Sequence, residues 1–542
     1  MIYIHFTLLF IPFLLSIFLI KLFSKKFFII INDKMELFLD KTLNKLNKEI
    51  NNFTPRGPIL SRKYDTRVEN IFLNWMNKYC DVYHQLVHEF NPSKIHTKQK
   101  NQSKSKSQSN KNKMEILLQQ IFNKQEKEKE QEQEKETETK PELLIDLKKA
   151  LKNKNSSKAL SEWFNKYNQL IYYSKDKYIS FIEYLENLKI KNKTQITLIS
   201  RLIAELEQYN MFMSFNIQID IQRGFKYEYS YNDSELEFKI YSNENIPIDN
   251  IYWRFLYARM KAIPRLYKKT DKINFEIILT DQLKELPRKS QIFGPEEVNS
   301  GSTNYQTITI WRKEEHFKII LHESIHFYNL DGSYDFFEQN NNINLECHYQ
   351  IAHKTETRIY EAYTESLAIF FNSFSNAYQI YYLNHIKQNQ NQTILDYNLI
   401  NKIRLHLWKQ EKKFFLLQIA KVFIHINPES NNFKDFLIDP KKCNESRNNI
   451  KHKLEETTSL LSYHIIKGAN IIFDQEFLEW IGNPFDTHPK SLYKFFEYVS
   501  QKTHNTTFIN LVNQSIKYLK EIGIHKFNKS LRMSSYDTEF NL

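Results

Sequence analysis

A histidine-glutamate pair with a second histidine three residues further on constrains this chain more than any other feature. Residues 321–327 read Leu-His-Glu-Ser-Ile-His-Phe, so His322 and His326 are four residues apart. On a helix two such imidazoles point the same way, about one turn apart, and can share one metal ion. Neutral imidazole suits zinc, which takes about four ligands, and Glu323 is placed to accept a proton from metal-activated water. The motif predicts a zinc hydrolase.

The residues around the motif favour a helix that follows a strand. Residues 311–328 contain no Gly or Pro, and apolar residues recur at helical spacing. We expect Glu314 and Glu315 in the first turn, where the helix dipole favours acidic side chains. Residues 305–311 alternate and are rich in β-branched residues, which predicts a strand. An edge strand beside such a helix can hold an extended peptide above the metal.

A third metal ligand is predicted downstream, within residues 358–372. There an apolar stripe at helical spacing predicts a largely buried helix, and Glu361 and Glu365 lie four residues apart beside it. A buried carboxylate without a partner is costly, so a metal ion or histidine partners would account for both glutamates. Two solvent-facing glutamates are the alternative.

The combination of His322-Glu323-x-x-His326 with Glu361-x-x-x-Glu365 resembles the gluzincin class of zinc metallopeptidases, over about residues 300–375. The resemblance implies that Glu361 is the third zinc ligand and that Glu365 hydrogen-bonds a ligand histidine, His322. Many members have Asp at the position of Glu365. The metzincin pattern needs a glycine at 329 and a histidine at 332, where this chain has asparagine and glycine. The Asn-, Lys- and Ile-rich, Gly-poor composition is also similar to that of zinc metalloproteinases of giant DNA viruses.

A second resemblance concerns Thr487-His488-Pro489 with Lys494. Some membrane-associated His-Glu-x-x-His peptidases carry a Thr-His-Pro segment with a basic residue, usually arginine, at the position of Lys494. The resemblance implies that His488 stabilises the oxyanion. A surface histidine before a helix-starting proline is the alternative, and Tyr463-His464 is a second candidate for the oxyanion donor.

The N-terminus predicts a membrane anchor. Residues 2–20 form an apolar run without formal charge that is just long enough to cross a bilayer. They lack the positive start and the small residues at a cleavage site that a cleaved signal peptide has. Lysines at 21, 25 and 26 follow, so we expect a single-pass protein whose body faces the cytosol. Cys80, Cys347 and Cys443 are too few for a disulfide scaffold and fit a reducing compartment.

The predicted fold class is α+β, with a zincin-like core of a small mixed sheet and an active-site helix. Within the core we expect a strand at 214–221, a hairpin about Asn232-Asp233, a helix at 251–263 ended by Pro264, and a strand at 273–279. A loop should cover 287–303. The regions predicted in chain order are a transmembrane anchor (1–22), a helical segment (23–92), a low-complexity charged linker (93–142), a helical region (143–210), the catalytic core (211–385) and a mostly helical C-terminal lobe (386–542).

These observations together predict a membrane-tethered zinc metallopeptidase with one Zn²⁺ per chain and a protein or peptide substrate. Glu323 would be the general base and a group such as His488 the oxyanion donor. Two alternatives stay open: a catalytically inactive, zinc-stabilised structural membrane protein, and a basic lipid- or nucleic-acid-binding protein. The net charge of +13 supports the latter, but it is spread through the chain. The Lys-rich linker therefore favours contact with anionic lipid, and no specific nucleic acid is expected because interleaved aromatics are absent.

Overall fold

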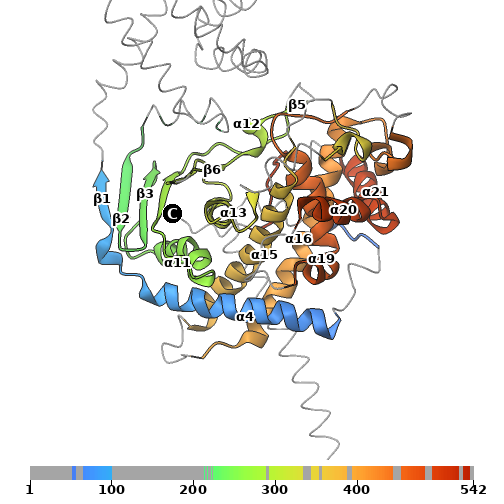
Figure 1. Ribbon diagram of the computed structural model, residues 1–542. Coiled ribbons are helices and arrows are strands. Elements are labelled where there is room, and N and C mark those ends of the chain that lie inside the picture. Colours follow the sequence, from blue (N-terminus) through green and yellow to red (C-terminus); the bar gives the residue numbers. More distant parts are fainter. Residues whose placement is uncertain are drawn as a thin grey trace, which may run out of the picture.

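The protein is an α+β structure in which helices outnumber strands (Figure 1). The computed structural model describes residues 50, 52–56, 65–99, 213, 217, 221, 224–287, 292–304, 306–333, 343–352, 357–386, 394–443, 453–482, 491–523 and 529–536. The α+β class predicted from the sequence is confirmed at this level. The predicted anchor (1–22) and helical region (143–210) lie outside the described residues. Residues 100–142 of the predicted linker lie outside them as well.

One six-stranded mixed sheet organises the N-terminal half of the fold, with strand order β1-β2-β3-β4-β7-β6. The β2-β3 hairpin is antiparallel, as predicted, β3, β4 and β7 run parallel, and β6 returns antiparallel to β7 at the edge. Alternate residues of β3 are buried because a pleated strand turns every second side chain to the same face. The strands are β1 (His96–Gln99), β2 (Tyr227–Asn232), β3 (Leu236–Ser242), β4 (Ile273–Ile278), β6 (Gly301–Thr303) and β7 (Ile308–Ile310).

Helices pack beside this sheet and link it to the C-terminal half (Figure 1). The helix α13 contacts β6 and β7 of the sheet as well as α11 and α15, so it connects the sheet with these two helices. The helix α4 crosses α11 and α15 and therefore belongs to the same hydrophobic core. These helices are α4 (Thr66–Glu89), α11 (Ile251–Leu266), α13 (His316–Phe327) and α15 (Tyr360–Tyr381).

The C-terminal half is almost all helix, as the apolar periodicity predicts. The helix α16 packs along α15 and against α21, and a π-helical segment, Leu461–Ile466, leads directly into α18. A two-stranded parallel ladder, β5 (Ile292–Phe293) with β8 (Glu455–Glu456), ties this half to the loop before β6. The remaining helices are α12 (Pro295–Val298), α16 (Tyr397–Ile426), α18 (Lys467–Ile472), α19 (Asp474–Ile481), α20 (Leu492–Thr503) and α21 (Thr506–Ile522).

Several predicted elements differ in the structure. The expected strand at 214–221 is wrong at its described positions, because Ile217 and Ile221 are helical and pack four residues apart in a small apolar cluster with Trp311. The start of the predicted linker forms β1, whose side chains are all exposed and so carry no apolar pattern. The helix α11 continues past Pro264 to Leu266, since a proline in the last turn removes only one hydrogen bond.

The expected loop at 287–303 contains three short elements, β5, α12 and β6. Residues 301–303 form the edge strand β6, and the strand predicted at 305–311 is confined to Ile308–Ile310. Glu314 and Glu315 precede α13 instead of occupying its first turn. Glu315 adopts the left-handed conformation with φ 63°, and both carboxylates are buried in ion pairs.

Cys347 and Cys443 form a disulfide, and Cys80 is free and buried. The expectation of unpaired cysteines is therefore wrong for two of the three. Within the described residues, no helix combines the length and the apolar character needed to cross a membrane.

Candidate metal centre

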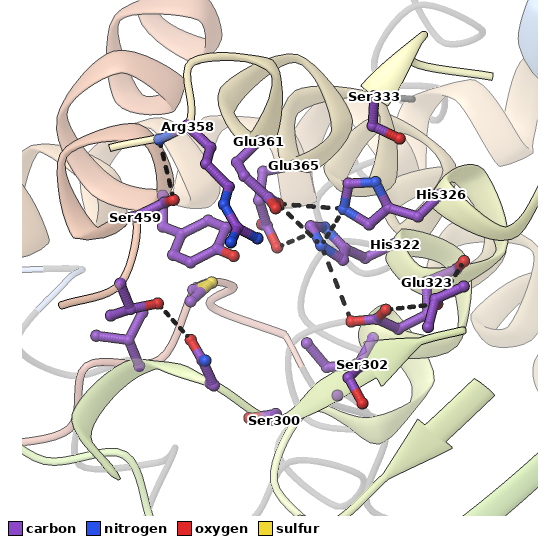
Figure 2. A pocket seen from close by; sticks show the side chains of 18 of the residues that line it. Ser300, Ser302, His322, Glu323, His326, Ser333, Arg358, Glu361, Glu365 and Ser459 are labelled. Carbon is purple, nitrogen blue, oxygen red and sulfur yellow. Dashed lines mark hydrogen bonds and ion pairs between the residues drawn. The ribbon is translucent and has the colours of Figure 1, made fainter. Parts of the chain in front are cut away.

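The two motif histidines and Glu361 converge at the junction of α13 and α15. His322 Nε2 lies 3.0 Å from His326 Nε2, and Glu361 Oε2 lies 3.1 Å from His326 Nε2 and 3.5 Å from His322 Nε2. Ligands bound to zinc at about 2.0–2.1 Å and tetrahedral angles lie about 3.3 Å apart. The three side chains thus have the spacing of a set that could hold one metal ion, and Figure 2 shows them facing one another.

Both imidazoles are held on their far side by carboxylates. Asp331 Oδ2 lies 2.6 Å from Nδ1 of His326, and Glu365 Oε1 lies 2.9 Å from Nδ1 of His322. A carboxylate accepts hydrogen bonds, so these contacts favour a proton on each Nδ1 and a lone pair on each Nε2. The position of Glu365 is the one that the resemblance implies for it.

With a proton on each Nδ1, three atoms that carry lone pairs lie close together. The two Nε2 atoms and the Glu361 carboxylate are then all acceptors, and they lie within 3.5 Å of one another without a donor among the three. Acceptors at this separation repel unless a proton or a cation lies between them. A metal ion fits this donor set, and the imidazole and carboxylate chemistry suits zinc among others.

The pKa shifts of the same groups favour protons on the histidines when no cation is bound. Burial lowers the pKa of His326, but Asp331 and Glu361 outweigh it and raise the pKa well above its ordinary value. The pKa of His322 is raised as well, against the effect of burial, by Glu365 and Glu361. Although burial raises the pKa of Glu361, the two histidines lower it far below its usual range. Protons therefore compete with a metal ion for this site.

Glu323 lies beside the three donors without joining them. Its Oε1 is 4.0 Å from His322 Nε2, while its Oε2 accepts a hydrogen bond of 2.7 Å from the Thr303 hydroxyl on β6. Gly301 makes room for this carboxylate, because a Cβ atom there would come within 2.8 Å of Glu323 Oε1 and 2.7 Å of Ile319 Cγ2. The edge strand β6 thus fixes the orientation of Glu323.

Glu365 is also the acceptor at the centre of a buried cationic cluster. Lys318 Nζ lies 2.5 Å from Oε1 and Lys467 Nζ lies 3.2 Å from Oε2, and all three side chains are at most 1% exposed. Burial raises the pKa of Glu365, but the two lysines and His322 bring it well below its ordinary value. Glu365 stays ionised and cannot rotate away from His322 without leaving two buried ammonium groups unpaired.

A cleft of about 490 Å³ opens from the three donors toward β6 and the π-helical segment. One wall carries the histidines, Glu361 and Arg358, and the opposite wall carries Ser300 and Ser302 (Figure 2). The β6 strand ends the sheet order, so its outer backbone edge has no neighbouring strand among the described residues. Such an edge can pair with an extended peptide.

The residues predicted as oxyanion donors do not all lie at the cleft. His488 lies outside the described residues, so its role stays a prediction. Tyr463 lines the cleft, with its ring centre 6.2 Å from that of His322. Burial raises the pKa of Tyr463 well above its usual value, and Glu361 and Glu365 add to the effect, so its hydroxyl keeps its proton. His464 is fully buried and does not line the cleft.

Sequence reasoning missed Asp331 as the partner of His326. Its carboxylate also accepts a 2.6 Å hydrogen bond from the Thr364 hydroxyl on α15. In the sequence, this aspartate lies five residues after His326 and directly before Gly332. In the structure, Asn329 and Gly332 have φ angles of 48° and 68°. These positive φ angles turn the chain back toward the helix that it has just left.

Comparisons with known proteins found no family model, no curated protein and no solved structure that matches this chain.

Proposed function

We propose that this protein is a zinc metallopeptidase of the gluzincin type, built on a zincin-like core and tethered to a membrane by its N-terminus. The observation that carries the proposal is that two imidazole nitrogens and a carboxylate converge beside Glu323, whose carboxylate the Thr303 hydroxyl orients. His322, His326 and Glu361 would hold one Zn²⁺. When bound, zinc supplies a Lewis acid that lowers the pKa of water and polarises a carbonyl.

The residues around the metal have separate roles in peptide hydrolysis. Glu323 takes the proton of the attacking water and delivers it to the leaving amine, while Thr303 holds the carboxylate in place. Asp331 and Glu365 fix the tautomers of His326 and His322. Tyr463 lines the cleft, and its hydroxyl would stabilise the oxyanion.

The edge strand β6 supports a peptide as the substrate over a small ester or amide. Ser300, Ser302 and Thr303 line the cleft from this strand and the residue before it, and among the described residues β7 is the only strand that pairs with β6. An extended peptide added there would gain main-chain hydrogen bonds with little dependence on sequence. The cleft would then place its scissile bond near Glu323.

The proposal is tested by zinc content and cleavage on the purified full-length chain. We expect about one zinc per chain, cleavage of casein, loss of both with a chelator and recovery of both on adding zinc. The variant Glu361→Gln should lose zinc and activity together. Wild-type protein without zinc, or with chelator-insensitive cleavage, contradicts the proposal. Zinc in place with no cleavage of unstructured or membrane-presented peptides would favour a zinc-stabilised structural protein.

A further inference from the structure

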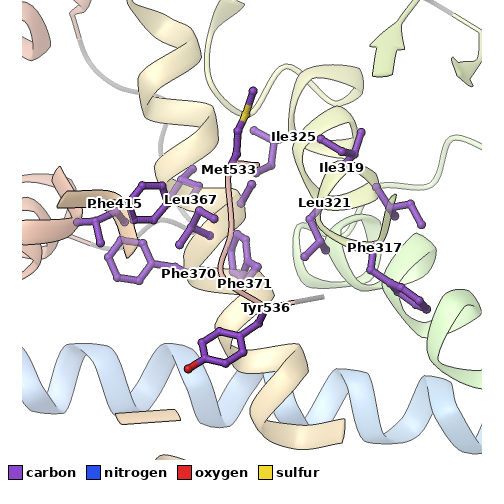
Figure 3. Packing of buried hydrophobic residues seen from close by; sticks show 14 of the residues in the cluster. Phe317, Ile319, Leu321, Ile325, Leu367, Phe370, Phe371, Phe415, Met533 and Tyr536 are labelled. Atoms are coloured by element: carbon purple, nitrogen blue, oxygen red, sulfur yellow. The ribbon is translucent and has the colours of Figure 1, made fainter. Parts of the chain in front are cut away.

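The C-terminal segment, residues 529–536, lies inside the protein beside the metal centre. Every residue of it from Ser530 to Tyr536 is buried. Figure 3 shows Met533 and Tyr536 on a chain that passes between α13 and α15, the helices that carry the three metal-site donors. Its start is fixed by backbone hydrogen bonds of 3.0 Å from Leu286 N to Lys529 O and 2.9 Å from Leu531 N to Lys284 O.

Met533 is the residue of this segment that lines the cleft. Its backbone N–H donates to Glu315 Oε1 at 2.8 Å, and its carbonyl accepts a 3.3 Å hydrogen bond from Lys467 Nζ. Its Sδ lies 3.7 Å from Lys318 Nζ. Because the backbone is held on both sides, the side chain keeps a defined place in the cleft wall.

The cleft is lined mainly by small polar residues and the ionisable groups of the metal centre. Its aliphatic lining comes from Val298, Ile319 and Met533, each at most 4% exposed. Ile319 lies one turn before Glu323 on α13, and Met533 contacts Glu315 and Lys318 at the start of the same helix. Ile319 is thus one turn from the general base, and Met533 lies against the first turn of the same helix.

We infer that Met533 is a specificity-determining residue, which with Ile319 forms a subsite for an apolar side chain next to the scissile bond of the substrate. This inference rests on the proposed function. A thioether on a flexible chain packs well against both aliphatic and aromatic groups, so the subsite accepts residues such as Leu, Met or Phe. The polar remainder of the cleft gives no comparable burial to an apolar group.

The test uses two ten-residue peptides of Ser, Asn and Gln that carry one central Leu or one central Ala. The wild-type protein should cleave the Leu peptide with the higher kcat/KM, at a bond flanking Leu. Met533→Ala should lower the Leu-to-Ala ratio of kcat/KM by at least about tenfold, since pocket contacts of a few methylenes decide such ratios. Met533→Leu, which keeps the volume, should retain most of the ratio.

Leu531→Ala is the matched control, because Leu531 is a buried residue of the same segment that does not line the cleft. It should leave the Leu-to-Ala ratio unchanged even where the protein is less stable. An unchanged ratio in Met533→Ala, or an equal fall in Leu531→Ala, overturns the inference while the proposed function stands.

A binding measurement tests the apolar subsite separately from the proposed peptide hydrolysis. The dissociation constants of the same peptides are compared for Glu323→Gln and for Glu323→Gln with Met533→Ala, which requires no turnover. The ratio should fall at least about tenfold here as well. Discrimination that depends on Met533, with no cleavage by the wild-type protein, supports the subsite and contradicts the hydrolase. Binding with no preference for Leu in the Glu323→Gln protein overturns the subsite.

Discussion

At the residue scale, the metal centre depends on what lies behind each donor. Asp331 and Glu365 lie against the far nitrogens of His326 and His322, which favours lone pairs on the near nitrogens that face Glu361. The protein tolerates this arrangement because both supporting carboxylates have further partners, Thr364 for Asp331 and two lysines for Glu365. Each histidine is therefore supported by a carboxylate, and each carboxylate by a further hydrogen bond or ion pair.

Asp331→Asn should weaken zinc binding about 10- to 100-fold, the usual effect of losing a carboxylate behind a ligand histidine. The amide keeps the size of the side chain but offers a neutral acceptor that can also rotate its NH₂ toward His326. The dissociation constant for zinc, measured by competition with a chelator of known affinity, checks this. Wild-type affinity in the variant would mean that Asp331 only ends the helix.

Gly301→Ala should lower kcat at least about tenfold and leave zinc content unchanged. The added methyl group meets Glu323 Oε1 at 2.8 Å and Ile319 Cγ2 at 2.7 Å, and overpacking of this kind typically costs about 1–3 kcal/mol. Gly294→Ala is the control, since its Cβ would lie 3.3 Å from its nearest neighbour, the Thr457 hydroxyl. Comparable kcat values for the two variants on casein would show that β6 does not orient the base.

The four-residue helical spacing predicted that His322 and His326 face the same way. The His-Glu-x-x-His motif indicated the role of Glu323, and the resemblance implied that of Glu361. Asp331 was not predicted as a partner of His326, since its position depends on two left-handed residues that reverse the chain. Lys318 and Lys467 could not be predicted either. A lysine in an apolar helical run indicates an exposed position until its buried carboxylate partner is known.

At the element scale, the core of the fold follows from patterns of burial. The β2-β3 hairpin, β4 and the long buried helix α15 could be predicted, because their apolar residues recur with period two or near 3.6. Strands without such a pattern were missed: β1 is fully exposed, and β6 consists of Gly, Ser and Thr at a sheet edge. The strand nearest the candidate active site was therefore the hardest to predict.

The C-terminal segment makes a testable contribution to stability through Glu411 on α16. Its carboxylate accepts hydrogen bonds of 2.6 Å from the Ser534 hydroxyl and 2.9 Å from Ser535 N, yet burial raises its pKa to about 7. A carboxyl whose folded pKa lies above its unfolded value stabilises fully below the unfolded pKa, near 4.5, and loses this contribution as pH rises through the folded pKa.

Between about pH 4.5 and 7, Glu411 should therefore reduce the free energy of unfolding by about 3 kcal/mol as pH rises. Glu411→Gln removes the ionisation, so the difference in unfolding free energy between wild type and variant should change in this window and be flat outside it. Urea titrations across the pH range measure this difference. A pH-independent difference would mean that Glu411 titrates near its ordinary pKa.

At the scale of the whole molecule, the sheet, α13 and the C-terminal half meet at one cleft, and chain segments from both halves line it. The sequence predicted separate regions in series, with the helical segment 23–92 ahead of the catalytic core. In the structure, α4 packs against α11 and α15, and residues 530–536 lie in the interior. Such long-range contacts cannot be read from local periodicity.

The N-terminal anchor remains a prediction from its charge-free apolar run and the three lysines that follow. Full-length protein expressed in cells should stay with membranes in alkaline carbonate, because only a spanning or lipid-anchored chain resists this treatment. A variant with Leu14 and Leu15 both changed to Lys interrupts the apolar run and should be released. Full-length protein in the carbonate supernatant would refute the anchor.

The central claim, that Glu323 is the general base of a zinc peptidase, is tested most directly by Glu323→Gln. This carboxylate lies outside the ligand set and is held by Thr303, so its loss should spare the metal and remove the proton acceptor. We predict wild-type zinc content, a wild-type unfolding temperature, and cleavage of casein slower by at least about a hundredfold. Equal cleavage by the zinc-loaded wild-type and Glu323→Gln proteins would contradict the account.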